Sequence, residues 1–258
     1  MNKRNGTESA GKDELIIGRQ PVLEALRRGQ LRLIYLAAGQ KGKIINQITR
    51  AARQQGLPLE VISRSELSRL ADGGNHQGVA ARARPFKYLT LTGLLDRVKV
   101  LTADPFLIML DHLQDPQNFG SLLRTADAAG MHGVIIPKDR TVKITPAVRK
   151  VAAGAAERLP VAQVVNLVDA IRQLKEAGFW LYGAEADGML PYYQVDYRGS
   201  FVLAVGSEGK GLSRLLREHC DGVISIPMRG EGGSLNAAVA AAVIIYAAAA
   251  QREGWTDQ

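Results

Sequence analysis

The chain has 258 residues, of which 46% are hydrophobic and 22% charged, so it holds enough apolar material for a packed core and is not a disordered protein. Its longest apolar run has 14 residues, whereas a membrane-spanning helix needs about 20, and its first residues lack the apolar stretch of a secretory signal. One cysteine, Cys220, excludes a disulfide framework, and the four histidines lack the spacing of metal ligands, so we expect a cytoplasmic protein without a metal site.

The positive charge of the chain is concentrated in one N-terminal segment. Residues 15–87 contain 13 Lys and Arg against 4 Asp and Glu, whereas residues 88–258 contain 17 against 18. Such a basic segment is typical of a module that binds a polyanion, and nucleic acid is the natural candidate. A basic surface that serves only solubility is the alternative.

The first half of the chain predicts a small α/β domain behind a tail. Residues 1–14 are polar and predict a flexible tail, and residues 15–87 then alternate between helical and extended patterns. Residues 88–105, with a helical piece around Leu94, are expected to connect this domain to a second one. Helices are expected near Pro21, over 43–55 and from an N-cap at Ser65 to Leu70, and strands over 33–36, 59–62 and 79–84.

Residues 106–258 predict a second domain in which strands and helices alternate. Short connections between them indicate a parallel sheet that is covered by helices on both faces. Strands are expected over 106–110, 133–137, 161–165, 179–184, 201–205 and 223–226, and helices over 119–129, 145–156, 167–177, 213–218 and 235–252. Ligands of such sheets bind beyond the carboxyl ends of the strands. This rule points to the loops 111–118, 206–212 and 227–234 and to the turn after Pro137.

The polar segment 111–124 follows the first buried strand of this domain. It contains Asn118 and, six residues later on the expected helix, Arg124, a residue type that clamps phosphates and carboxylates. A surface pair between Arg124 and Asp127 is the alternative. His112, in the same loop, is a minor candidate for acid–base chemistry.

Two glycine-rich segments follow later strands. Residues 206–211 allow backbone amides to approach a ligand closely, but they match neither the P-loop nor the dinucleotide fingerprint. In residues 230–236, we expect Ser234 to cap the last helix and Asn236 to lie inside that helix. The helix is almost uniformly apolar, which predicts burial or contact with another subunit.

These segments, in this order, resemble the signature motifs of the SpoU (TrmH-like) RNA ribose 2′-O-methyltransferases. The matching residues are 118–124 for the first motif, 206–212 for the second, and 226–228 with 234–236 for the third. The basic segment, through residues 18–26 and 75–79, resembles the L30e-like substrate-binding domain of some family members. Within the family, the combination is most similar to enzymes that methylate a guanosine of large-subunit (23S) ribosomal RNA.

The resemblance implies a SPOUT-type α/β fold with a trefoil knot in the second domain, residues 106–258. It also implies S-adenosyl-L-methionine as cofactor, RNA as substrate and a homodimer. By motif position it assigns Asn118, Arg124, Glu208, Ser234 and Asn236 to the catalytic surface, and Gly206, Ile226, Met228 and Leu235 to the cofactor pocket. Ala237-Ala238 stands where the family often has Val-Ser, so we expect no secondary hydroxyl contact there.

The reaction that the resemblance implies is transfer of a methyl group to a ribose 2′-hydroxyl. Because a guanidinium stays protonated, we expect Arg124 to bind the target phosphate and stabilise negative charge rather than to act as the base. Three alternatives remain open. They are a transfer-RNA target, another ribosomal nucleotide as in antibiotic-resistance methylases, and a non-catalytic RNA-binding protein of ribosome assembly.

Overall fold

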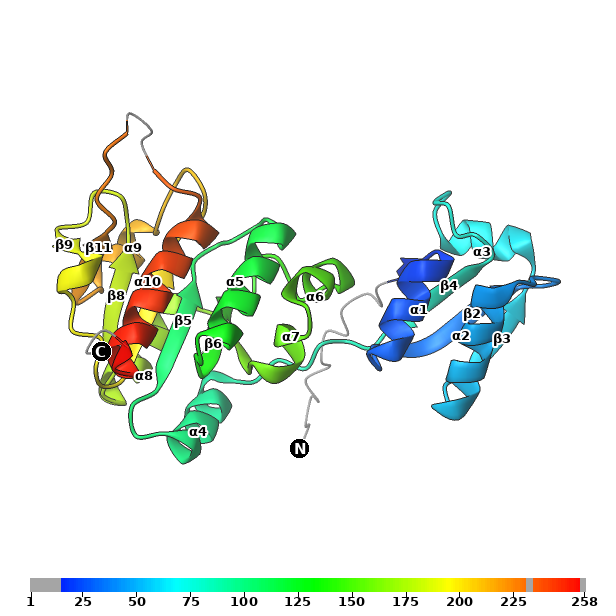
Figure 1. Ribbon diagram of the computed structural model, residues 1–258, viewed down its shortest axis with the longest axis horizontal. Helices are drawn as coiled ribbons and strands as arrows, with labels where there is room; N and C mark the ends of the chain where they lie inside the picture. Colours follow the sequence, from blue (N-terminus) through cyan, green and yellow to red (C-terminus); the bar gives the residue numbers. More distant parts are fainter. Residues whose placement is uncertain (1–14, 231–233, 256–258) are drawn as a thin grey trace, which may run out of the picture. The chain divides into compact units, whose positions relative to one another are not determined.

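The computed structural model describes residues 15–230 and 234–255, so the predicted tail, residues 1–14, lies outside the described residues. The chain divides into two compact units, Met1–Phe86 and Lys87–Gln258 (Figure 1). Each has its own hydrophobic core. In the described part of the chain, no helix combines the length and the apolar character that crossing a membrane requires.

The first unit is a four-stranded mixed sheet with helices on both faces, where the sequence predicted a small α/β domain with three strands. Its elements are β1 (Leu15–Ile17), α1 (Arg19–Arg27), β2 (Leu31–Ala37), α2 (Lys43–Gln54), β3 (Leu59–Ile62), α3 (Arg64–Leu70) and β4 (Val79–Ala83). The strand order is β1-β4-β2-β3; β2 and β3 are parallel, and β4 is antiparallel to β1 and β2. α1 and α2 pack on one face, and Leu67 of α3 packs on the other.

Local sequence explains most of these elements, with two differences from the prediction. α2 buries Ile45, Ile48 and Ala52, which lie on one helical face. α3 is capped by Ser63 and not by Ser65: the Ser63 hydroxyl accepts the Glu66 N–H, and the Glu66 carboxylate accepts the Ser63 N–H at 2.9 Å. β1 was not predicted, because three residues carry too little pattern.

The second unit is a seven-stranded sheet between two layers of helices. Its elements are α4 (Leu91–Leu101), β5 (Phe106–Leu110), α5 (Pro116–Ala128), β6 (Gly133–Pro137), α6 (Pro146–Ala152), α7 (Ala155–Arg158), β7 (Val161–Val164), α8 (Leu167–Glu176), β8 (Trp180–Ala184), β9 (Leu190–Pro191), η1 (Tyr192–Gln194), β10 (Phe201–Val205), α9 (Arg214–Glu218), β11 (Gly222–Ser225) and α10 (Ala237–Arg252). The strand order is β7-β6-β5-β10-β8-β11-β9, and all neighbours are parallel. The predicted parallel sheet is confirmed.

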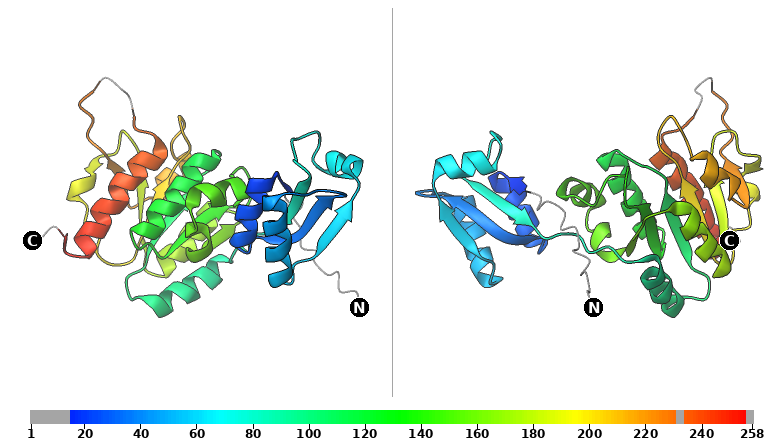
Figure 2. Two further views of the ribbon diagram at one scale, coloured as in Figure 1. Left: turned by 45° about the vertical axis from the view of Figure 1, so that its right-hand side comes forward. Right: turned by 180° about the vertical axis from the view of Figure 1, so that it is seen from behind.

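The two helical layers bury the central strands of the sheet. α5, α6, α7 and α10 cover one face of the sheet, and α4, α8 and α9 cover the other (Figures 1 and 2). Every residue of β5 and β10 is buried, and Phe106 and Phe201 stack at their amino ends with ring centroids 4.2 Å apart. The loops at the carboxyl ends of these strands are therefore held by the most buried part of the unit.

Three segments differ from the prediction. The expected helix 145–156 is two helices, α6 and α7, because Ala153 and Gly154 adopt left-handed backbone with φ of 51° and 95°. The segment 88–105 is not a linker, since α4 packs Leu94 and Val98 into the core of the second unit. β9 and η1 were not predicted. The trefoil knot stays a prediction.

Candidate functional site

Four strands of the second unit end at one edge of the sheet, where the sequence predicted binding loops. Val205 of β10 lies opposite Leu110 of β5 and Ala184 of β8, so the loops after these strands leave the sheet side by side. β11, which ends at Ser225, brings a fourth loop to the same edge.

Asn118, Glu208 and Asn236 meet at this edge, and we call them the amide–carboxylate cluster. The Asn118 Nδ2 donates to the Glu208 Oε1 at 2.5 Å, and the Asn236 Nδ2 donates to the same oxygen. The Asn236 Nδ2 also lies 3.2 Å from the Asn118 Oδ1. Two amides thus fix one carboxylate, and all three side chains are at least partly exposed, so a ligand can reach them.

The start of α5 positions Asn118. Asp115 is the N-cap, and its carboxylate accepts the N–H groups of Gln117 and Asn118 at 3.2 and 3.1 Å. Pro116 occupies the first helical position, where its missing N–H costs nothing. Asn118 therefore lies in a well-defined first turn at the sheet edge.

The start of α10 positions Asn236, and here the prediction was wrong. Asn236 is the N-cap and does not lie inside the helix: its Oδ1 accepts the N–H groups of Ala238 and Val239 at 2.9 and 3.2 Å. Ser234, the predicted cap, lies outside the helix. An Asn side chain caps a helix as well as Ser does and also carries an amide nitrogen, which here reaches Glu208.

The glycine-rich loop is a tight turn that closes on itself. Ser207 and Gly211 exchange backbone hydrogen bonds of 3.0 and 2.9 Å. A Cβ on Gly206 would overlap the carbonyl group of Gly211, so no side chain fits at that position. Glu185, directly after β8, accepts the Leu212 N–H at 2.5 Å. The base of the loop is therefore anchored, and its exposed tip carries the cluster's glutamate.

An ion-pair network reinforces this anchor. Arg217 lies 3.3 Å from Glu185 and 3.0 Å from Asp187. The hydrogen bond and the charge of Arg217 hold the pKa of Asp187 below its ordinary value. Asp187 thus stays ionised, and charged groups link the loop after β8 to α9 (Arg214–Glu218), the helix that follows the glycine-rich loop.

Three of the four predicted cofactor residues line one small cavity between β8, β11 and α10. Its volume is about 70 Å³ and its walls are mainly apolar. The lining residues are Ala184, Glu185, Ala186, Ile224, Ile226, Met228, Ser234, Leu235, Ala240 and Ile244. Ser234, predicted for the catalytic surface, lines this cavity. Gly206, the fourth predicted cofactor residue, lies at the base of the glycine-rich loop instead.

Arg124 takes no part in the hydrogen bonds of the amide–carboxylate cluster. It is exposed on α5 and makes no hydrogen bond or ion pair with the residues that the structure describes. Asp127, the alternative partner, is paired with Arg158 at 2.5 Å between Oδ2 and Nη2. The alternative of a surface pair with Asp127 is therefore wrong, and the Arg124 guanidinium is accessible to a ligand.

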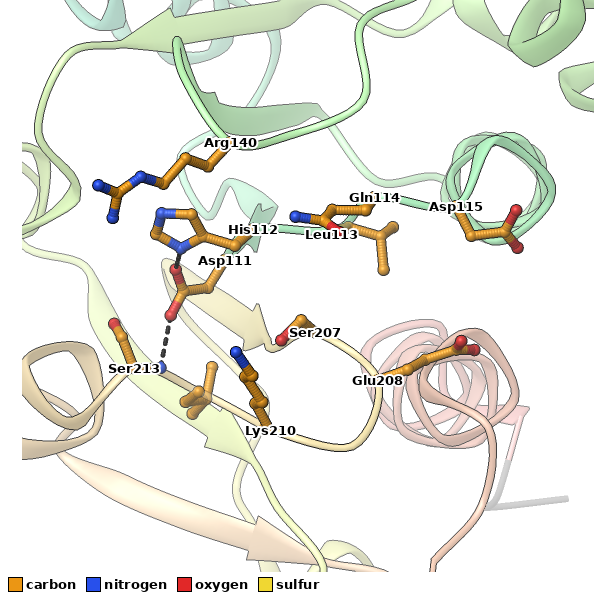
Figure 3. Close-up of a pocket in the computed structure, with 12 residues that line it drawn as sticks. Asp111, His112, Leu113, Gln114, Asp115, Arg140, Ser207, Glu208, Lys210 and Ser213 are labelled. Carbon is orange, nitrogen blue, oxygen red and sulfur yellow. Dashed lines mark hydrogen bonds and ion pairs between the residues drawn. The ribbon is translucent and has the colours of Figure 1, made fainter.

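A larger cavity of about 590 Å³ lies between the glycine-rich loop and the loops after β5 and β6. Asp111, His112, Arg140 and Lys210 lie around it (Figure 3). Asp111 is buried; its Oδ1 contacts the His112 Nδ1, and its Oδ2 accepts the Ser213 N–H at 2.6 Å. Sequence reasoning singled out His112 but missed the other three, although Asp111 directly follows a buried strand and Arg140 lies in the turn after β6.

Both units match family models. Residues 105–246 match the SpoU rRNA Methylase family, and residues 15–89 match the RNA 2′-O ribose methyltransferase substrate binding domain. The 23S rRNA (guanosine-2′-O-)-methyltransferase RlmB of Shewanella oneidensis is 41% identical over 243 residues, which cover 93% of this chain and 98% of that protein.

Solved structures agree with this assignment. The SpoU methyltransferase AviRb from Streptomyces viridochromogenes, in complex with AdoMet, matches with a TM-score of 0.67 and 28% identity over 94% of this chain and 91% of its own. The A. aeolicus TrmH/SpoU tRNA modifying enzyme matches with a TM-score of 0.55 and 29% identity over 65% of this chain and 87% of its own. The resemblance seen in the motifs is confirmed, and the chain belongs to the SpoU rRNA methylase family.

Proposed function

We propose that this protein transfers a methyl group from S-adenosyl-L-methionine to a ribose 2′-oxygen of RNA, with a guanosine of 23S ribosomal RNA as the target. The observation that carries the proposal is the meeting of Asn118, Glu208 and Asn236 at the sheet edge in a member of the SpoU family. The similarity to RlmB over almost the whole chain supports the choice of target.

The small cavity fits the cofactor by its chemistry. Ile226, Met228 and Leu235 provide apolar walls that suit a purine ring, and Ser234 adds a hydroxyl. Gly206 keeps the neighbouring loop tight enough for its backbone to form an edge of the site. When bound, S-adenosyl-L-methionine supplies a methyl group that is activated by the positive sulfonium charge.

The task of the chain is to orient the acceptor ribose. Glu208 presents a fixed carboxylate that accepts a hydrogen bond from the 2′-hydroxyl, and the amides of Asn118 and Asn236 flank it. Arg124 binds the phosphate of the target nucleotide and stabilises the negative charge that develops on the 2′-oxygen while the hydroxyl proton passes to the Glu208 carboxylate.

The first unit brings the RNA. Its excess basic residues bind RNA phosphates independently of the base sequence. Specificity comes from recognition of an unstacked base in an RNA loop. Exposed basic side chains on its helices and loops are Arg27, Lys41, Lys43, Arg50 and Arg53. Because ribosomal RNA is the target, the expected location is the cytoplasm.

We also propose that the protein is a homodimer that uses α10. This helix leaves two large apolar side chains exposed to water, Val239 by 50% and Tyr246 by 44%. Covering them with a second copy removes apolar surface from water, and a two-fold arrangement is the commonest solution for such a patch.

A methylation assay tests the proposed activity. The purified protein is incubated with labelled S-adenosyl-L-methionine and either unmodified 23S ribosomal RNA or unmodified transfer RNA, with Glu208→Ala as the inactive control. We expect label in one ribose of the 23S RNA. Label in transfer RNA instead would identify the protein as a tRNA methyltransferase. The structural similarity to the A. aeolicus enzyme favours this alternative. No label in either RNA, together with no binding of the cofactor, would leave a non-catalytic RNA-binding protein.

A further inference from the structure

The 590 Å³ cavity is separate from the apolar cavity, because the two share no lining residue. It is also directly joined to the amide–carboxylate cluster, since Glu208 belongs to both. Whatever occupies this cavity therefore lies next to the ribose that the cluster is proposed to orient.

The carboxylates around this cavity are already engaged. Asp111 is bonded to His112 and to the Ser213 N–H, and Asp115 caps α5. Glu208 accepts two amide hydrogen bonds. Their negative charge is thus partly compensated by donors outside the cavity or in its wall.

The basic side chains around the cavity are not engaged. Arg140 and Lys210 are exposed and make no hydrogen bond or ion pair with any described residue. They lie on opposite walls, with the His112 ring beside Arg140 and the Ser207 hydroxyl near Lys210 (Figure 3).

The backbone supports the same interpretation. Arg140 and His112 both have left-handed φ, of 57° and 59°, which is uncommon for residues other than glycine. Such conformations cluster at binding sites as well as in tight turns. Here they belong to the two loops that form one wall of the cavity.

We propose that this cavity binds a phosphodiester group of the RNA that neighbours the target nucleotide, with Arg140 and Lys210 as its ligands. The inference rests on the proposed function and adds a subsite to it. Two cations on opposite walls of one cavity, unpaired among the described residues, attract a phosphate, and the His112 ring and the Ser207 hydroxyl add hydrogen-bond partners. The bound phosphate then fixes the position of the RNA strand along the site, so that one ribose lies next to Glu208.

One other anion of the reaction has similar chemistry, namely the carboxylate of S-adenosyl-L-methionine. The apolar cavity that we propose for the purine ring of the cofactor has no lining residue in common with the basic one, so we favour the RNA phosphate. Separate measurements of cofactor affinity and RNA affinity distinguish the two sources.

The experiment uses the full chain with Arg140→Gln, Lys210→Gln and both changes together, and the charge-preserving variants Arg140→Lys and Lys210→Arg. Arg97→Gln is the matched control, because Arg97 is an exposed cation on α4 outside both cavities and the cluster. RNA binding is measured by filter binding between 50 and 200 mM salt, cofactor binding by calorimetry, and turnover by methyl incorporation.

We expect each Gln variant to weaken RNA binding about tenfold and to lower the salt dependence of binding by about one counterion. KM for RNA rises while kcat changes little, cofactor affinity is unchanged, and the charge-preserving and Arg97→Gln variants bind RNA nearly as the wild type does. Unchanged RNA affinity and salt dependence in the double variant would overturn the proposal. So would a loss of cofactor affinity with RNA affinity intact. Because RNA binding is measured without turnover, its result does not depend on whether the protein methylates RNA as proposed.

Discussion

The side-chain amide of Asn236 donates a hydrogen bond to the side-chain oxygen of Asn118 at 3.2 Å, although 118 residues separate them in the sequence. Each lies at the start of a helix, and those helices, α10 and α5, pack against each other on one face of the sheet. The two helix starts therefore hold Glu208 between them, and changes at either one are expected to move the carboxylate.

Substitution of Asn236 separates its two roles. Asn236→Ala removes the cap of α10 and should lower the free energy of unfolding by about 1 kcal/mol. Asn236→Asp keeps a cap but places a second carboxylate beside Glu208. We expect methyl transfer to fall on the order of 100-fold in both variants, because the acceptor loses its alignment. Thermal unfolding and single-turnover rates check this. An Asp variant with the wild-type rate would show that the amide nitrogen is dispensable.

Gly206→Ala is expected to be strongly destabilising. The new methyl group would overlap the Gly211 carbonyl and the Leu212 amide nitrogen, and backbone groups cannot rotate away as a side chain can. We expect the free energy of unfolding to fall by about 2 to 3 kcal/mol. We also expect the variant to lose cofactor binding. Gly230→Ala is the matched control, since a Cβ there meets nothing within 4 Å. Equal unfolding temperatures for the two variants would contradict the close approach.

Arg124→Ala tests a residue that the structure leaves exposed. Because Arg124 has no partner among the described residues, its removal should leave the unfolding temperature within about 1 °C. Cofactor affinity should also be unchanged, whereas turnover should be lost, since the charge that binds the target phosphate is gone. Arg124→Lys should recover only part of the rate, because lysine cannot form the bidentate hydrogen bonds that arginine makes with a phosphate. Normal methyl transfer by the Ala variant would remove Arg124 from the catalytic surface.

The sequence was sufficient to predict six of the seven strands of the second unit. Continuous apolar runs such as 201–205 identify buried parallel strands, and glycine or asparagine residues mark the loops at their carboxyl ends. The break between α6 and α7 was missed: Gly154, a residue type that often ends helices, stands inside the expected helix, whereas Ala153 is a good helix former and gives no sign of its left-handed backbone.

The site was predicted in part, and the gaps have physical causes. Motif positions named the residues of the cluster, but which side chain caps α10 depends on the geometry that Glu208 imposes on Asn236. Arg140 lies in no motif, and Lys210 lies within the second motif but was assigned no role there. Their proximity to one cavity follows from the pairing of β5 with β6 and β10, which periodicity does not reveal.

Removal of residues 1–87 should leave the second unit folded. Tyr88 and Leu89, just beyond the cut, belong to that unit: the Ile144 N–H donates to the Tyr88 hydroxyl at 2.8 Å, and Leu89 exchanges backbone hydrogen bonds with Val161 and Gln163. We expect the truncated protein to bind S-adenosyl-L-methionine normally and RNA at least tenfold more weakly, because most of the basic excess is gone. Calorimetry and filter binding measure the two affinities.

A slightly longer deletion serves as the control. Removal of residues 1–90 also takes away Tyr88 and Leu89 and should lower the unfolding temperature by several degrees, which the shorter deletion does not. RNA affinity that is unchanged in the folded 1–87 deletion would contradict the division of labour between the two units.

Cys220 should be unreactive in the folded protein. Burial raises the pKa of its thiol to about 12, and the thiol donates a hydrogen bond to the Leu216 carbonyl. At pH 8 only about one thiol in ten thousand is then ionised, whereas an unfolded chain with a pKa near 8.5 has about a quarter of its thiol as thiolate. Iodoacetamide at pH 8 should therefore label the native protein at least a hundredfold more slowly than the protein in denaturant, with the labelled mass measured over time. Prompt labelling of the native protein would mean that α9 opens readily from the sheet, and that the anchor of the glycine-rich loop through Arg217 on the same helix is loose.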